Sequence, residues 1–143
     1  MSSQIEFPTN ADIRFRRGAK ALILRGDRVL LTKERHSDGS VFWTLPGGGA
    51  RQEETRTAAL QRELYEELNC RAVIQGELTQ FWYAHVSCDQ TVSHCAVFDC
   101  TLISSASPNA REGIYDKQWA RPDDLPPSTL PQVRFTIENW CGL

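Results

Sequence analysis

The segment GGARQEETRTAALQRELYEELNC, residues 48–70, constrains the fold of this chain more than any other part of the sequence. It predicts an amphipathic helix over residues 55–68, because three leucines at four-residue spacing form one apolar stripe: Leu60, Leu64 and Leu68. Thr55 suits the N-cap of such a helix, and Asn69 suits the left-handed residue that often ends one. A helix with a single apolar stripe packs against another layer, which favours a helix lying on a sheet.

The same helix carries a cluster of negative charge: Glu63, Glu66 and Glu67. Residues three and four apart on a helix are neighbours, and like charges at that spacing repel by a few tenths of a kcal/mol per pair. The cluster is centred roughly a quarter-turn from the leucines, so the helix can pack on a sheet while its glutamates face a cleft. Charge pattern alone favours a solvated face, but carboxylate oxygens are also the ligands that Mg²⁺ prefers.

Apolar runs on both sides of the helix predict a mixed sheet between helices. Two strands, at about residues 19–25 and 28–33, are joined by a turn at Gly26 and Asp27, and VFWTLP adds a short third strand. Two further β-rich runs, residues 72–86 and 91–103, flank the polar connection SCDQ. After a long loop, QWA predicts a short strand and PQVRFTIENW a terminal helix with proline in its first turn.

The residues around the helix also follow a fixed spacing. Gly48 is followed after five residues by Glu54, and after seven more by the run RELYEELNC, which begins at Arg62. This pattern resembles the Nudix box of the Nudix hydrolase superfamily, G-x5-E-x7-R-E-U-x-E-E-x-G-U, where U is a bulky aliphatic residue. Two positions depart from it, Asn69 for glycine and Cys70 for the aliphatic residue, and neither carries charge. The complete set of charged positions outweighs the interpretation as a solvated face.

The resemblance implies an α/β fold, the Nudix α/β/α sandwich, with one domain over residues 1–143 and a loose N-terminal segment at about 1–12. It implies an enzyme that uses Mg²⁺, with Mn²⁺ as a substitute, to cleave the diphosphate linkage of a nucleoside diphosphate joined to another group. A nucleoside triphosphate is the favoured substrate, as in MutT-like members, and ADP-ribose or a nucleotide sugar is the alternative. A non-catalytic Nudix-like module that binds a nucleotide is the alternative from another class.

The resemblance also assigns roles within the box. Glu63 and Glu67 are expected to be the principal metal ligands. Glu66 is expected to be a ligand, directly or through water, and the backbone of Gly48 is expected to join the metal shell. We expect Arg62 to be one of the catalytic residues. It is expected to pair with Glu66, because a paired neighbour fixes the orientation of a metal ligand.

Further candidates lie outside that core. Glu54 is expected to support the site by orienting Arg62, and Glu112, in REGIYDKQW, resembles the downstream glutamate of MutT-type enzymes that serves as metal ligand or general base. Gly47, Lys33 and Arg35 are the candidates for binding substrate phosphates. A basic alternation near the start of the chain is interpreted as a solvated edge strand rather than a phosphate contact: Arg14, Arg16, Arg17 and Lys20.

Composition excludes several other classes of protein. The net charge of −2 and pI near 5.9 argue against a protein that wraps duplex nucleic acid, whereas a small nucleotide needs only a local basic cluster. No apolar run approaches the roughly 20 residues of a membrane helix, and the N-terminus has no signal architecture. Five cysteines, an odd count at low density, predict reduced thiols and a cytoplasmic protein. The resemblance implies a monomer or a homodimer.

Overall fold

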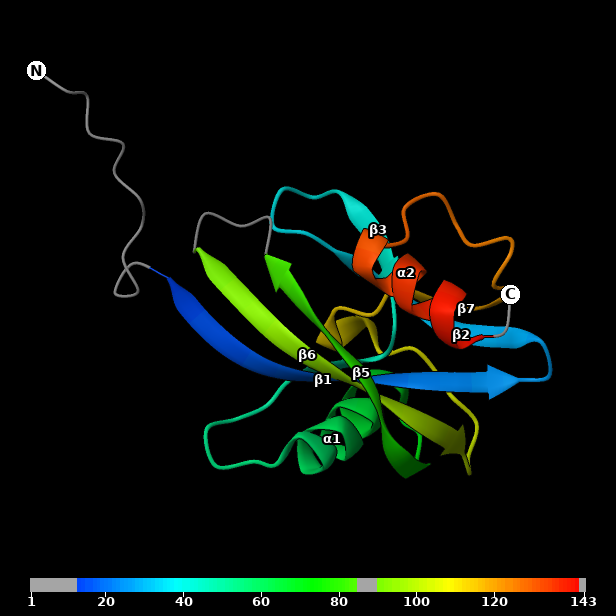
Figure 1. Ribbon diagram of the computed structural model, residues 1–143, viewed down its shortest axis with the longest axis horizontal. Helices are drawn as coiled ribbons and strands as arrows, with labels where there is room; N and C mark the ends of the chain where they lie inside the picture. The colour runs from blue at the N-terminus through cyan, green and yellow to red at the C-terminus, as the bar shows by residue number, and fades with distance from the viewer. Residues whose placement is uncertain (1–12, 85–89, 142–143) are drawn as a thin grey trace, which may run out of the picture.

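The computed structural model describes residues 13–84 and 90–141. Within them, seven strands form one mixed sheet (Figure 1): β1 (Arg14–Arg25), β2 (Arg28–Arg35), β3 (Val41–Thr44), β4 (Gly47–Gly49), β5 (Ala72–Ala84), β6 (Thr91–Leu102) and β7 (Asp116–Ala120). Helix α1 (Arg56–Leu68) follows β4, and helix α2 (Pro131–Trp140) ends the described chain. The long loop after β6 contains a single 3₁₀ turn, η1 (Ala110–Glu112).

The main path of the sheet runs β3-β2-β1-β6-β5, with β4 paired to β1 and β7 paired to β2. Strand β1 runs parallel to β6 from Arg14 to Ile23, while the other strand pairs are antiparallel. The expectation of an edge strand is wrong for Lys20, which pairs with both β6 and β4. Arg14, Arg16 and Arg17 are exposed and, among the described strands, pair only with β6. The three consecutive glycines, Gly47–Gly49, form the short strand β4, because their backbone pairs with that of Gly18, Ala19 and Lys20.

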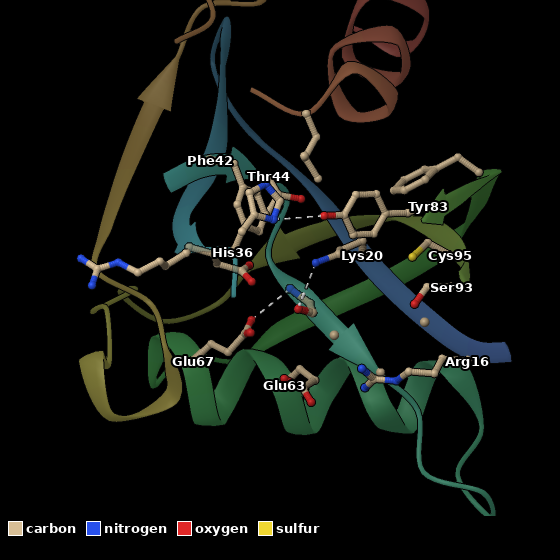
Figure 2. Close-up of a pocket in the computed structure, with 18 of the residues that line it drawn as sticks. Arg16, Lys20, His36, Phe42, Thr44, Glu63, Glu67, Tyr83, Ser93 and Cys95 are labelled. Atoms are coloured by element: carbon tan, nitrogen blue, oxygen red, sulfur yellow. Dashed lines mark hydrogen bonds between the residues drawn. The ribbon is translucent and has the colours of Figure 1, made fainter. Parts of the chain in front are cut away.

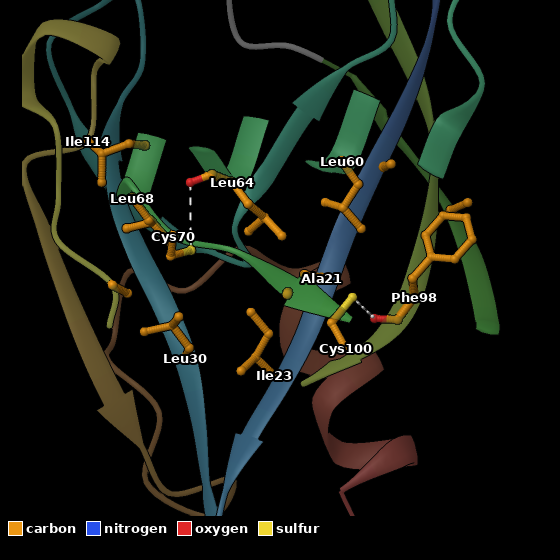
Figure 3. Close-up of a cluster of buried hydrophobic side chains, with 14 residues drawn as sticks. Ala21, Ile23, Leu30, Leu60, Leu64, Leu68, Cys70, Phe98, Cys100 and Ile114 are labelled. Atoms are coloured by element: carbon orange, nitrogen blue, oxygen red, sulfur yellow. Dashed lines mark hydrogen bonds between the residues drawn. The ribbon is translucent and has the colours of Figure 1, made fainter. Parts of the chain in front are cut away.

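Helix α1 covers one face of the sheet and α2 the other (Figure 1). The three predicted stripe leucines have no exposed surface, and they pack with Ala21 and Ile23 of β1 in one core (Figure 3). Leu22, between those two, points to the opposite face and joins a second core with Val133 and Ile137 of α2. The two cores on opposite faces of one sheet confirm the predicted α/β/α sandwich.

Helix α1 begins and ends where the sequence predicts. The hydroxyl of Thr55 accepts a hydrogen bond from the backbone N–H of Ala58 at 3.1 Å, and Asn69 has the left-handed conformation, with φ 48° and ψ 42°. Cys70 is buried in the core below α1, and its thiol donates to the Leu64 carbonyl at 3.6 Å (Figure 3). Both departures from the box pattern are thus compatible with the fold.

The other predicted elements agree in kind with the structure. The first two strands meet at a turn at residues 26–27, VFWT and QWA lie in strands, and PQVRFTIENW is α2, with its proline in the first turn. The predicted N-terminal segment, residues 1–12, and most of the SCDQ connection lie outside the described residues. In the part of the chain that the structure describes, no helix is long and apolar enough to cross a membrane.

Candidate active site

A cavity of about 410 Å³ is lined mainly by residues of α1 and of strands β1 to β6 (Figure 2). Glu63 and Glu67 of α1 line one side of it, and the glycine strand β4 also contributes to its wall. His36, Phe42 and Tyr83 lie on the other side of the cavity, away from the helix (Figure 2). The volume is within the range of small-molecule sites, and the two sides offer different chemistry to a ligand.

Arg62 joins the charged residues beside the cavity. Its Nε and Nη2 donate to the two carboxylate oxygens of Glu54, both at 2.8 Å. Its Nη1 donates to Glu63 at 2.8 Å and to Glu66 at 3.2 Å, and Nη2 also reaches the Gly49 carbonyl at 3.0 Å. The hydrogen bonds from Arg62 are the main reason that the pKa of Glu54 falls to about 2. The guanidinium is therefore fixed between the glycine strand and the helix.

Glu67 is the most buried of the box glutamates, with 6% of its surface exposed. Its carboxylate accepts a hydrogen bond from the Gly47 backbone N–H at 3.1 Å (Figure 2). Burial raises the pKa of Glu67 to about 8, and the nearby carboxylates of Glu34 and Glu63 add to this against the opposing charge of Lys20. A bound cation would stabilise the ionised form of Glu67.

Gly48 lies against the carboxylate of Glu63. A Cβ atom at this position would be 2.7 Å from both Cδ and Oε2 of Glu63, closer than non-bonded atoms approach. At Gly49 an added Cβ would collide with the guanidinium of Arg16. The glycine strand thus gives these two charged side chains the space to reach the cavity.

Lys20 crosses the cavity from β1 and is a residue that sequence reasoning placed elsewhere. Its ammonium group donates to the Gly47 carbonyl at 3.2 Å (Figure 2). Burial alone would lower the pKa of Lys20, but the carboxylates of Glu34 and Glu67 outweigh burial and raise it. One signal was available in the sequence, because Lys20 is the only charged residue within the run GAKALIL.

The comparison with protein-family models shows which family the chain belongs to. The family model described as NUDIX domain matches residues 14–141. The chain belongs to the NUDIX domain family. This confirms the resemblance stated from the sequence, and it supports the expected class of enzyme, a Nudix hydrolase.

The individual relatives are distant in sequence. The RNA pyrophosphohydrolase of Orientia tsutsugamushi (strain Boryong) is 29% identical over 75 residues, which are 52% of this chain and 46% of that protein, so the match spans about half of the relative. The nucleoside triphosphatase NudI of Escherichia fergusonii is 26% identical over 114 residues, covering 72% of this chain and 80% of that protein. The MutT NUDIX hydrolase structure from Burkholderia pseudomallei has a TM-score of 0.78 at 24% identity, covering 89% of this chain and 98% of that one. This structural match shows the shared fold.

The two expected phosphate-binding side chains of β2 lie in different places. Arg35 lines the cavity, and its guanidinium carbon lies 4.8 Å from the centre of the Tyr115 ring. Lys33 is absent from the lining of the cavity in the described chain, and its ammonium lies 5.9 Å from the Trp43 ring centre. The cavity therefore brings Arg35, but not Lys33, together with the box glutamates.

The loop that carries Glu112 is attached to α1 through Asn109. The Asn109 side-chain amide donates to the Glu66 carbonyl at 3.0 Å, and its backbone N–H donates to the Glu67 carbonyl at 2.8 Å. Glu112 itself is exposed, in the 3₁₀ turn that begins after Asn109. Sequence reasoning did not identify Asn109, whose contacts hold the loop beside the C-terminal half of α1.

Membership of the family implies a bound divalent cation, and some of the predicted ligand residues are placed where they could hold one. Glu63 and Glu67 line one cavity beside the Gly48 backbone, and a hard cation such as Mg²⁺ takes a few carboxylates and keeps several waters. Among residues 13–84 and 90–141, however, no three acidic, histidine or cysteine side chains converge on one point. Glu66 instead pairs with Arg62. The residues fit a cation held by two carboxylates with water and substrate oxygens completing its shell.

Proposed function

We propose that this Nudix protein is a Mg²⁺-dependent pyrophosphohydrolase that cleaves a phosphoric anhydride bond of a nucleotide, with a nucleoside triphosphate as the favoured substrate. The observation that supports this most directly is the shared cavity of Glu63 and Glu67 beside the glycine strand. The bound cation, with Mn²⁺ as a substitute, supplies neutralisation of phosphate charge and activation of water. Its binding relieves the repulsion between the two carboxylates, which gives their clustering a function.

The remaining box residues position those two carboxylates. Arg62 holds Glu63 at 2.8 Å, while the bidentate pair with Glu54 fixes the guanidinium plane. The Gly47 N–H bond to Glu67 orients the second carboxylate. Because each carboxylate is held by a separate donor, the protein fixes the spacing of the pair before substrate arrives.

The contacts to the substrate phosphates come from the rim of the cavity. We assign Arg35 to this role because it is one of the residues that line the cavity and its guanidinium always carries a positive charge. Lys33 stays a weaker candidate, since its contact with Trp43 lies outside the cavity lining. Gly47 contributes backbone to the wall of the cavity, but its N–H already donates to Glu67.

Glu112 is proposed as the further acidic residue, acting as metal ligand or as general base. In support of this role, its loop is held to α1 by the two hydrogen bonds of Asn109, close to the backbone of Glu66 and Glu67. Its side chain is exposed in the described structure. Substitution with glutamine is the direct test, because a base or ligand contributes to turnover, whereas an exposed surface residue does not.

The choice of a nucleoside triphosphate is supported by the relatives. Of the two relatives described above, the one with the greater coverage is named a nucleoside triphosphatase, and one of the matched solved structures is a MutT NUDIX hydrolase. ADP-ribose or a nucleotide sugar is the alternative substrate, and a non-catalytic binding module is the alternative from another class. We also place the protein in the cytoplasm, where the buried free thiols of Cys70, Cys95 and Cys100 would stay reduced.

Phosphate release from a substrate panel with Mg²⁺ tests the proposal. The panel contains the common nucleoside triphosphates, ADP-ribose, a nucleotide sugar and an oligoribonucleotide with a 5′-triphosphate. We expect Glu67→Gln to lower turnover by about two orders of magnitude or more while leaving the melting temperature close to that of the wild type. Glu138→Gln, at an exposed position of α2, is the matched control. Equal activity of wild type and Glu67→Gln, or no hydrolysis of any panel member, would reject the assignment.

A further inference from the structure

Two buried side-chain atoms lack a hydrogen-bond partner among the residues that the structure describes: Glu34 Oε2 and Thr44 Oγ1. Buried polar atoms are nearly always paired, so each exception needs an explanation. Both residues line the same cavity that holds Glu63 and Glu67. Two unpaired polar atoms on the wall of one cavity point to a ligand that pairs with them.

The two residues share one face of neighbouring strands. Strands β2 and β3 are antiparallel, with Thr32 opposite Thr44 and Glu34 opposite Phe42, so Glu34 and Thr44 are diagonal neighbours. Phe42 stacks on His36, with ring centres 4.0 Å apart and an angle of 19° between the planes. The wall therefore combines two polar atoms with an aromatic surface, within the reach of one planar ligand.

The charge of Glu34 restricts what this part of the cavity can bind. A carboxylate repels phosphate, so the phosphates cannot be the groups that meet it. The cation of the proposed function is assigned to Glu63 and Glu67 on the other side of the cavity, so it does not need Glu34 as a ligand. Burial raises the pKa of Glu34 and the carboxylate of Glu63 adds to this, while Lys20 and His36 oppose the shift. The remaining partner is a group that donates a hydrogen bond.

We propose that Glu34 and Thr44 recognise the polar edge of the substrate's nucleobase, with Glu34 Oε2 accepting a base N–H and the Thr44 hydroxyl donating to a neighbouring base oxygen or ring nitrogen. This inference rests on the proposed function, and it identifies the part of the nucleotide that binds on the Glu34 side of the cavity. A base that fills this space displaces water from both atoms, so a base lacking the N–H leaves a buried carboxylate oxygen unpaired. The site selects bases that carry a donor beside an acceptor, and it discriminates against base-free polyphosphates.

The first test is kinetic and uses Glu34→Gln and Thr44→Val, which keep the shape of each side chain. We expect Glu34→Gln to lower kcat/KM for the best nucleoside triphosphate about tenfold or more, and Thr44→Val to lower it severalfold. Hydrolysis of inorganic tripolyphosphate, which has no base, should stay within about twofold of the wild type for Thr44→Val. For Glu34→Gln it should fall much less than nucleotide hydrolysis does, because that change also alters the charge near Glu67. Glu138→Gln is the control, and thermal unfolding establishes that each variant is folded. Equal losses on both substrates would assign Glu34 to the phosphates or the cation and overturn the inference.

The second test is binding without metal, and it does not depend on catalysis. Calorimetry compares the four common nucleoside monophosphates with ribose 5-phosphate. We expect the wild type to bind at least one nucleotide more tightly than ribose 5-phosphate, and Glu34→Gln to remove most of that preference. If the wild type shows no preference for a base, or Glu34→Gln keeps it, the inference fails. A wild type that binds a base but hydrolyses no nucleotide would reject the proposed function while leaving base recognition supported.

Discussion

Replacing Gly48 with alanine should disable the site while leaving the fold intact. The added Cβ would lie 2.7 Å from Cδ and Oε2 of Glu63 and 3.0 Å from Oε1, whereas ordinary contacts begin at 3.4 Å. Glu63 cannot simply rotate away, because Arg62 Nη1 holds its Oε1 at 2.8 Å. The carboxylate must therefore move outward or break its bond to Arg62, and either change alters its spacing from Glu67.

The size of the effect follows from that displacement. Clearing the overlap moves the Glu63 carboxylate by up to about 1 Å, and an error of that size in a catalytic group can cost about 100-fold in rate. The cost to stability is smaller, because the group in the way is the end of a flexible side chain. Losing the partly exposed Arg62–Glu63 pair costs about 1 kcal/mol or less. We therefore expect a turnover about 100-fold lower in a protein that still folds.

The assay is Mg²⁺-dependent phosphate release from the preferred nucleotide, with thermal unfolding measured on the same samples. Gly76→Ala is the matched control, because an added Cβ there meets nothing within 4 Å. We expect this control to keep the activity of the wild type. Full activity of Gly48→Ala would refute the argument that the glycine gives Glu63 its position, and an unfolded Gly48→Ala would refute the claim that the collision is local.

Three other predictions concern stability and thiol chemistry. Gly47→Ala should lower the free energy of unfolding by at least about 2 kcal/mol, measured by urea denaturation, since Gly47 has φ 137° and its Cβ would strike backbone atoms. Cys70 and Cys100 should resist alkylation in the folded protein, detected by mass spectrometry, because burial raises their thiol pKa values to about 11 and 12. The pKa of Glu54 is lowered to about 2 from 4.5, so its stabilising pair with Arg62 persists above pH 4.5 and is lost as pH falls toward 2. The melting temperature of Glu54→Gln should therefore change less than that of the wild type over this range.

The box helix could be predicted from the sequence because its information is local. Apolar spacing, a capping threonine and a terminal asparagine each act within a few residues, and the structure has all three at the expected positions. The pairing of Arg62 with Glu66 follows from their spacing of four residues on one helix, and its pairing with Glu54 was expected from the resemblance. Those parts of the site needed no knowledge of the tertiary fold.

The roles of Lys20 and Glu34 could not be obtained in that way. Lys20 was interpreted with a basic alternation on an edge strand, but parallel pairing with β6, more than seventy residues later in the chain, makes β1 a central strand. Glu34 received no role, because nothing near it in the sequence shows that its carboxylate enters a cavity. Both depend on which strands become neighbours, and that is decided by contacts between distant segments.

The acidic residues of the site separate into two groups by what stabilises their charge. Glu54 is stabilised by Arg62, so its pKa falls to about 2, and it needs nothing further from a ligand. For Glu67, burial and two like charges together outweigh Lys20 and raise the pKa to about 8, so the protein leaves its ionised form short of positive charge. Environments that move two carboxylates in opposite directions commonly mark different roles. On this basis we propose that Glu54 positions the arginine, and that a divalent cation would be stabilised most by Glu67 together with Glu63 in the same cavity.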